Sequence, residues 1–149
     1  MDMRPLVIAH RGASAEYPEN TILAIEKALA YGADAVEVDV RATKDGELVV
    51  IHDETVDRTT DGRGRVADLT LAELKRLSAP MGQKVPTLDE VMGRVARRRR
   101  AGLVIELKAE GIEGAAVELA RRRGLLDRAI FTSFFHPCVR RVKEREPSA

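Results

Sequence analysis

The sequence predicts an α/β protein in which helices cover a mainly parallel β-sheet. Two observations indicate this class: short apolar runs typical of buried strands alternate with helical patterns, and turn residues separate the two kinds of segment. The 149 residues are enough for one domain with a buried core. Such an alternation forms either an open sheet or part of a (β/α)₈ barrel. A complete barrel needs about 250 residues, so the chain supplies roughly half of one.

The first unit is a strand followed by a helix. The short apolar run PLVIAH at 5–10 is typical of a buried parallel strand. The helix after it begins at a cap formed by Asn20 or Thr21, and Gly32 ends it. The valine-rich segment at 34–42 predicts the second strand.

A hairpin extends the second strand before the alternation resumes. The turn sequence TKDG leads into a returning strand at 47–52, and the Gly- and Asp-rich segment 53–69 is predicted as a loop. The remaining elements are predicted as helix 69–77 capped by Thr70, helix 87–100 capped by Thr87, strand 101–108, helix 112–124, strand 128–135 and helix 137–146.

The composition gives no bulk attraction to nucleic acid or to an anionic membrane, because the net charge is only +1. The single cysteine, Cys138, cannot form an intramolecular disulfide and fits a reducing compartment. No segment has the pattern of a signal peptide or the roughly 18 apolar residues of a membrane span. We therefore expect a cytoplasmic protein without stable membrane insertion.

The run Arg97–Arg100 is expected at an exposed helix C-terminus, with a phosphate-binding patch as the alternative.

Acidic side chains share one face of two predicted strands. Side chains two apart on a strand point the same way, so Glu37 and Asp39 lie together, opposite the intervening valines. The later strand repeats the pattern with Glu106 and Lys108. Neighbouring buried carboxylates repel each other and need a cation to stay charged together. All-oxygen ligation by Glu37, Asp39 and Glu106 would suit a hard divalent cation, Mg²⁺ or Ca²⁺.

Basic side chains are predicted at the same end of the sheet. The first strand ends in His10 and Arg11, and the hairpin returns His52 toward the acidic strand. Histidines can act as general acid and base, and Arg11 with Lys108 can bind a phosphate oxygen. The combination is typical of metal-assisted cleavage of a phosphoester.

Each of these features also has a structural explanation. His10 alone could be a polar strand end, and His52 with Asp53 could stabilise a turn. The two acids of the second strand could lie on an exposed edge strand, and the Glu and Lys of the later strand could form a structural ion pair. The functional interpretation is preferred because these polar residues fall at corresponding ends of successive strands.

The motifs H-R-G, E-N-T, E-x-D, T-K-D-G, H-D and E-x-K occur in this order from about Leu6 to Phe134. Together they closely resemble the glycerophosphodiester phosphodiesterase family. The resemblance implies a TIM-type barrel and hydrolysis of glycerophosphodiesters, such as glycerophosphocholine or glycerophosphoethanolamine, to an alcohol and glycerol 3-phosphate. It implies the following roles: His10 and His52 as the acid/base pair, Glu37, Asp39 and Glu106 as metal ligands, Arg11 as a phosphate contact and Lys108 as a residue that neutralises charge.

The chain departs from this family in length. We expect residues 1–149 to form one phosphodiesterase domain that is incomplete at its C-terminal end, about the first half of the eight-stranded barrel. The expected partner is a small-molecule diester, with self-association through exposed half-barrel edges as a further expectation. Two alternative functions stay open: a lysophospholipase D-like phosphodiesterase, and a catalytically silent binding module.

Overall fold

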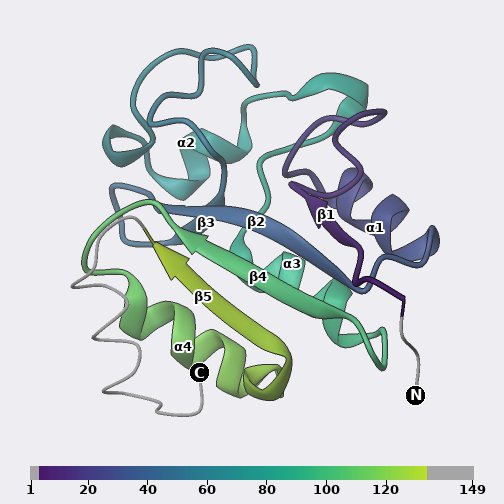
Figure 1. The fold of residues 1–149 in the computed structure, drawn as a ribbon. Helices are drawn as coiled ribbons and strands as arrows, with labels where there is room; N and C mark the ends of the chain where they lie inside the picture. Colours follow the sequence, from purple (N-terminus) through teal and green to yellow (C-terminus); the bar gives the residue numbers. More distant parts are fainter. Residues whose placement is uncertain (1–3, 134–149) are drawn as a thin grey trace.

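The computed structural model describes residues 4–133, and Figure 1 shows them as an α/β fold around one sheet. The strands are β1 (Ile8–His10), β2 (Ala35–Ala42), β3 (Leu48–Val50), β4 (Gly102–Leu107) and β5 (Ala129–Ser133). The helices are α1 (Ile22–Ala30), α2 (Leu71–Lys75), α3 (Leu88–Ala96) and α4 (Glu113–Arg122), with short 3₁₀ turns at Val66–Asp68, Pro80–Gly82 and Leu126–Arg128.

The sheet has the order β1-β2-β4-β5, and these strands are all parallel. The hairpin strand β3 lies outside this path and pairs antiparallel with the end of β2, with Val40 opposite Val50. The register sets Asp39 opposite Glu106 and His10 opposite Glu37, so their side chains share one face. The predicted parallel sheet with a hairpin extension is therefore confirmed.

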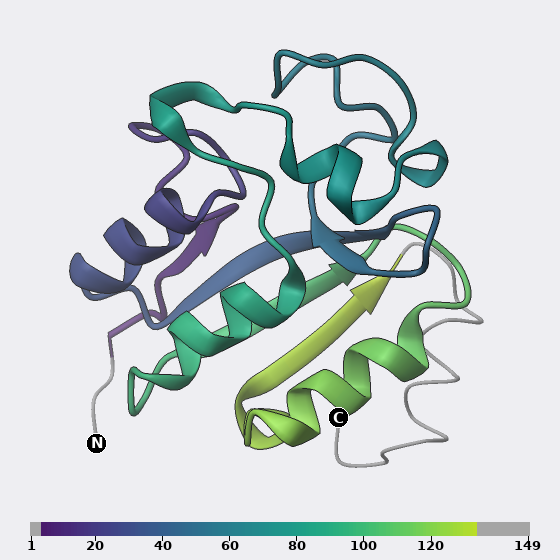
Figure 2. The ribbon, with the colours of Figure 1, turned by 180° about the vertical axis from the view of Figure 1, so that it is seen from behind.

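Helices α1, α3 and α4 lie against a single face of the sheet (Figure 2). Val36, Val38 and Val40 of β2 point toward them and are fully buried, as the alternation of acids and valines predicts. Threonine side chains begin three helices: Thr21, Thr70 and Thr87 each accept a hydrogen bond from a backbone N–H of the first turn. The main core therefore lies between the helices and the valine face, and it includes the large side chains Ile25, Leu88, Met92, Leu103, Ile105 and Leu107.

In the described part of the chain no helix covers the opposite face of the sheet (Figure 1), although Glu37 and Asp39 are buried at its carboxyl end. Leu6 is 75% exposed, Ile8 52% and Ile130 59%, whereas Val104 in the middle of the sheet is partly buried. In a closed barrel this face would line the interior. Among the described residues, no helix is long and apolar enough to cross a membrane.

A small lobe rises above the carboxyl ends of the strands. It consists of β3, the segment from 51 to 70 and α2, and it has a core of its own in which Val49, Val56 and Leu74 are completely buried. The segment predicted only as a loop thus contributes to a packed unit. It also contains an isolated bridge between Thr55 and Arg65.

Within residues 4–133 the predicted elements are present, but several are shorter than expected. The helix predicted to reach residue 100 ends at Ala96, because the apolar periodicity stops at Val95 and the four following arginines repel one another. Arg97–Arg100 are exposed after that helix end rather than within it. The first strand begins at Ile8 instead of residue 5. The helix predicted at 137–146 lies outside the described residues.

Candidate active site

Three carboxylates from two strands converge at the carboxyl ends of the sheet. One oxygen from each of Glu37, Asp39 and Glu106 lies within 4.8 Å of the others. Asp39 is completely buried and Glu37 is 9% exposed. Both carboxylate oxygens of Glu37 and Oδ1 of Asp39 are buried without a hydrogen-bond partner. Buried anionic oxygens of this kind fit a hard divalent cation, which binds oxygen ligands.

The electrostatics of the cluster agree with its geometry. Burial, followed by the neighbouring negative charges of Asp39 and Glu106, raises the pKa of Glu37 to about 7. A carboxylate pair that close cannot stay fully charged in a buried place unless a positive charge joins it. A cation placed among the three carboxylates would therefore compete with the proton on Glu37.

Asp39 is held in place from the side opposite its unpartnered oxygen. Asn20 donates from Nδ2 to Asp39 Oδ2 at 3.0 Å, and Arg11 Nε lies 3.2 Å from the same oxygen. Asn20 is 3% exposed and has a positive φ of 57°, a conformation that asparagine tolerates better than most residues. The loop after β1 therefore fixes the orientation of this carboxylate and leaves Oδ1 without a hydrogen-bond partner.

A chain of alternating charges connects Arg11 to His52. Arg11 donates to Glu19 at 3.0 Å, and Arg58 binds Glu19 through both oxygens at 2.7 and 3.0 Å. Arg58 also holds both oxygens of Asp53 at 2.8 and 3.0 Å. Asp53 in turn pairs with Nδ1 of His52 at 2.8 Å. The hydrogen bonds from Arg58 are the main reason that the pKa values of Asp53 and Glu19 are lowered.

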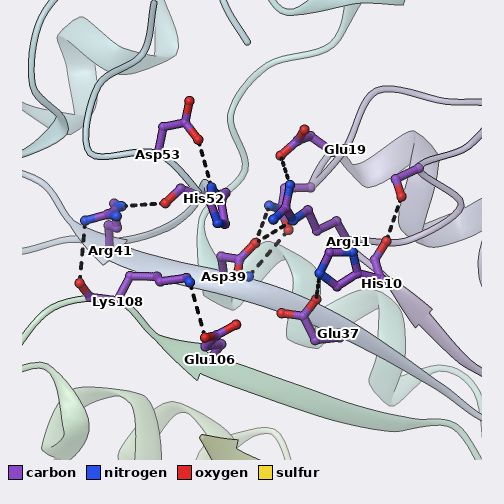
Figure 3. Close-up of polar contacts among 12 residues, drawn as sticks. His10, Arg11, Glu19, Glu37, Asp39, Arg41, His52, Asp53, Glu106 and Lys108 are labelled. Carbon is purple, nitrogen blue, oxygen red and sulfur yellow. Dashed lines mark hydrogen bonds and ion pairs between the residues drawn. The ribbon is translucent and has the colours of Figure 1, made fainter. Parts of the chain in front are cut away.

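The two histidines lie on different sides of the carboxylates, as Figure 3 shows. His10 extends from the end of β1, its side chain is 65% exposed, and its Nε2 lies 3.4 Å from Oε2 of Glu37. His52 follows β3, and its side chain is 34% exposed. With Nδ1 directed to Asp53, the Nε2 atom of His52 is the ring nitrogen that faces away from that carboxylate. Each ring thus has a carboxylate that can orient it.

The remaining predicted residues also gather here (Figure 3). Lys108 donates from Nζ to Glu106 Oε1 at 3.2 Å, so the ion pair considered from the sequence is present. That pair sits beside the acidic cluster and adds a positive charge to it. Arg41 donates from Nε to the backbone oxygen of His52 at 2.9 Å and ties the hairpin to the acidic strand.

The seven residues proposed from the sequence come together: His10, Arg11, Glu37, Asp39, His52, Glu106 and Lys108. Sequence reasoning missed the supporting contacts of Asn20 and Arg58. The E-N-T motif marked Asn20 without a chemical role, and the loop that contains Arg58 has no periodicity from which a partner could be inferred.

The chain is similar to known proteins over nearly its whole length. The model of the glycerophosphoryl diester phosphodiesterase family matches residues 10–148. A glycerophosphodiester phosphodiesterase of Caldanaerobacter subterraneus subsp. tengcongensis is 43% identical, over 97% of this chain and 64% of the relative. The human glycerophosphodiester phosphodiesterase 1 is 35% identical, over 93% of this chain and 45% of the relative.

Solved structures give the same result. A phosphodiesterase of Oleispira antarctica in complex with the product sn-glycerol-3-phosphate has a TM-score of 0.89 and 36% identity, covering 96% of this chain and 63% of that one. A glycerophosphodiester phosphodiesterase of Agrobacterium tumefaciens has a TM-score of 0.88 and 37% identity, covering 97% of this chain and 64% of that one. The chain thus spans less than two thirds of these relatives, and its sheet corresponds to part of their TIM-type barrel. It belongs to the glycerophosphoryl diester phosphodiesterase family.

Proposed function

We propose that this chain carries the catalytic part of an enzyme that hydrolyses glycerophosphodiesters to an alcohol and glycerol 3-phosphate. The observation that carries the proposal is the convergence of Glu37, Asp39 and Glu106 between two histidines. The names of its relatives support the reaction, and the product bound in the Oleispira antarctica structure supports a small-molecule substrate. Glycerophosphocholine and glycerophosphoethanolamine are the first substrates to test.

We propose that Glu37, Asp39 and Glu106 hold one Mg²⁺ or Ca²⁺ ion. The unpartnered buried oxygens of Glu37 and Asp39 and the all-oxygen donor set support this assignment. A divalent cation at this place supplies charge neutralisation and polarisation of the phosphoryl group. Arg11 and Lys108, at the border of the cluster, are proposed to bind the phosphate oxygens through charge-assisted hydrogen bonds.

The histidines are proposed to move the protons. One ring takes the proton from the attacking hydroxyl as its oxygen bonds to phosphorus. The other ring gives a proton to the leaving oxygen. The bond between phosphorus and that oxygen breaks, and the electron pair of the bond stays on the leaving oxygen. The position of His10 and His52 on different sides of the carboxylates supports this division, because attacking and leaving oxygens lie on opposite sides of phosphorus.

Residues 1–149 are proposed to belong to one cytoplasmic catalytic domain.

The proposal is tested by hydrolysis of glycerophosphocholine with added Mg²⁺ or Ca²⁺, followed as release of glycerol 3-phosphate. His10→Ala and His52→Ala are each expected to lower turnover by at least about 100-fold. Both variants should still bind the cation, since the proposed ligands are carboxylates. Lys44→Ala, an exposed change on the hairpin turn, is the control and should keep parental activity. Absence of release by the parent chain would contradict the proposed activity and favour a silent binding module.

A further inference from the structure

Glu19 is a mostly buried carboxylate beside the candidate active site, outside the cluster of three acids and without a part in the proposed proton transfers. Its side chain is 18% exposed. Arg11 donates to its Oε2 at 3.0 Å, and Arg58 donates to its Oε1 at 2.7 Å and to its Oε2 at 3.0 Å. Two guanidinium groups thus meet at one oxygen. Because like charges repel each other, this arrangement depends on the negative charge of Glu19.

The two arginines lead from Glu19 to different parts of the site. Arg11 lies beside the acidic cluster, and its Nε is 3.2 Å from one of the carboxylate oxygens there (Figure 3). Arg58 lies toward the hairpin and binds both oxygens of Asp53, the residue that pairs with His52. Glu19 therefore connects the residue proposed to bind phosphate with a ring proposed to move a proton.

The backbone on both sides of Glu19 is held by hydrogen bonds. The backbone N–H of Asn20 donates to the backbone oxygen of Arg11 at 3.0 Å. The hydroxyl of Thr21 donates to the backbone oxygen of Pro18 at 2.7 Å, and Thr21 also begins helix α1. A side chain that is presented from such a fixed loop can define the positions of the groups that bind it.

The network needs both oxygens of Glu19 as acceptors and needs their charge. The hydrogen bond from Arg58, followed by the charges of Arg11 and Arg58, lowers the pKa of Glu19 although burial opposes this. A glutamine at this place would keep one acceptor oxygen, but its NH₂ group would face N–H donors of a guanidinium group. Glu19→Gln therefore keeps the size of the side chain and disturbs the orientation of the arginines.

We propose that Glu19 is a positioning residue shared by the phosphate-binding and the proton-transfer parts of the site. Through Arg11 it acts on binding of the substrate phosphate, and through Arg58 it acts on the ring of His52. The proposal rests on the proposed phosphodiesterase function and gives the E-N-T motif a role in it. Loss of Glu19 should then weaken both binding and turnover, whereas loss of the Arg58 contacts alone should affect turnover.

The test is a double-mutant cycle on hydrolysis of glycerophosphocholine with Mg²⁺ present. Glu19→Gln should raise KM about tenfold and lower kcat about tenfold. In an Arg58→Lys background, Glu19→Gln should lower kcat little further, because both changes release the same contacts to His52, yet KM should still rise about tenfold. Glu16→Gln makes the same charge change at an exposed residue of the same loop and should keep the parental constants.

Additive losses of kcat in the cycle would overturn the shared role. Parental kcat and KM in Glu19→Gln, together with a lower Tm, would also overturn it, since the contacts would then only tie two loops together.

A parent chain inactive on the diester would count against the proposed function, and two measurements without turnover then decide on Glu19. In ¹⁵N NMR, His52 should show one tautomer in the parent and a mixture in Glu19→Gln. Glycerol 3-phosphate, titrated with Mg²⁺ present, should bind Glu19→Gln about tenfold more weakly than the parent. A folded Glu19→Gln protein with the parental tautomer and the parental affinity would overturn the positioning role.

Discussion

Asn20 and Asp39, nineteen positions apart, are joined by a hydrogen bond of 3.0 Å from Nδ2 to Oδ2 inside the protein. The bond leaves Oδ1 of Asp39 unpartnered and buried among the other carboxylates. Groups that orient a metal ligand from behind typically affect metal affinity by 10- to 100-fold. The amide of Asn20 thus supports the candidate metal site through Asp39, although Asn20 is not one of the three clustered carboxylates.

Asn20→Gly is expected to lower the affinity for Mg²⁺ or Ca²⁺ by about tenfold, because Asp39 loses the donor that orients it. Glycine is chosen because it accepts the positive φ of this residue, whereas alanine would add strain. Titration calorimetry measures the affinity, and a thermal melt followed by circular dichroism checks that the fold is kept. Parental affinity in a folded Asn20→Gly protein would rule out this orienting role.

The pKa of Glu37 predicts how stability depends on pH. In the folded chain this pKa is raised to about 7 by burial and by the neighbouring carboxylates, from about 4.5 in the unfolded chain. Between these values the folded state holds a proton that the unfolded state has released. Without a divalent cation, the free energy of unfolding should therefore fall as pH rises from about 4.5 to 7 and then level off.

A divalent cation should reverse this trend, because it takes the place of the proton. The increase in Tm on adding 10 mM Mg²⁺ or Ca²⁺ should be small at pH 5 and should grow until about pH 7.5. Melts across this range, with and without EDTA, provide the measurement. Glu37→Gln should remove most of the fall in stability; an unchanged pH profile in that variant would assign the titration to another group.

Arg58 is expected to position His52 through Asp53. Arg58→Lys keeps the charge but cannot bind Glu19 and Asp53 in the same bidentate manner, so kcat should fall about tenfold with little change in KM. The ¹⁵N NMR signals of His52 should also show a mixture of tautomers. Arg63→Lys lies on the same loop with a 91% exposed side chain and serves as control. A single His52 tautomer and parental kcat in Arg58→Lys would contradict the positioning role.

Self-association through the uncovered face of the sheet is a further prediction. Ile8 and Ile130 expose more than half of their surface there. Burying each side chain would stabilise the associated form by roughly 1.5 kcal/mol, which corresponds to about a tenfold larger association constant. Replacing both by lysine should lower hydrophobic-dye binding and raise the dimer dissociation constant by about 100-fold in light scattering. Met81→Lys, at an apolar residue equally exposed elsewhere, should change neither. A parent that is monomeric and binds no dye would disprove this expectation.

The sequence predicted those parts of the molecule in which the spacing of residues along the chain decides which way their side chains point. Alternation along β2 placed its valines on the helix side and Glu37 with Asp39 on the other. Thr70 and Thr87 were predicted as helix caps, and of the two candidates Asn20 and Thr21 the structure has Thr21 as the cap of α1. The register of parallel strands then brings Glu106 opposite Asp39. The shared face follows because successive side chains of a strand point to opposite faces of the sheet, and the shared end follows because the strands run in the same direction.

The contacts that support the site could not be predicted in the same way. Arg58 and Glu19 are separated by 39 positions, and Arg58 lies in a loop whose folding depends on a second small core. Nothing in the spacing of the polar residues between 53 and 69 shows which of them turns inward. Helix ends were also misplaced, since the run Arg97–Arg100 extends the helical composition beyond the last buried turn.

The central claim is that three carboxylates form one divalent-cation site, and calorimetric titration of Mg²⁺ and Ca²⁺ tests it most directly. The parent is expected to bind one ion per chain, and Asp39→Asn should weaken that binding by at least about 100-fold, because it removes a ligand and its charge. Asp127→Asn, an exposed change after α4, should bind like the parent. Equal affinity in the parent and in Asp39→Asn, or no binding by the parent at millimolar concentrations, would contradict the account.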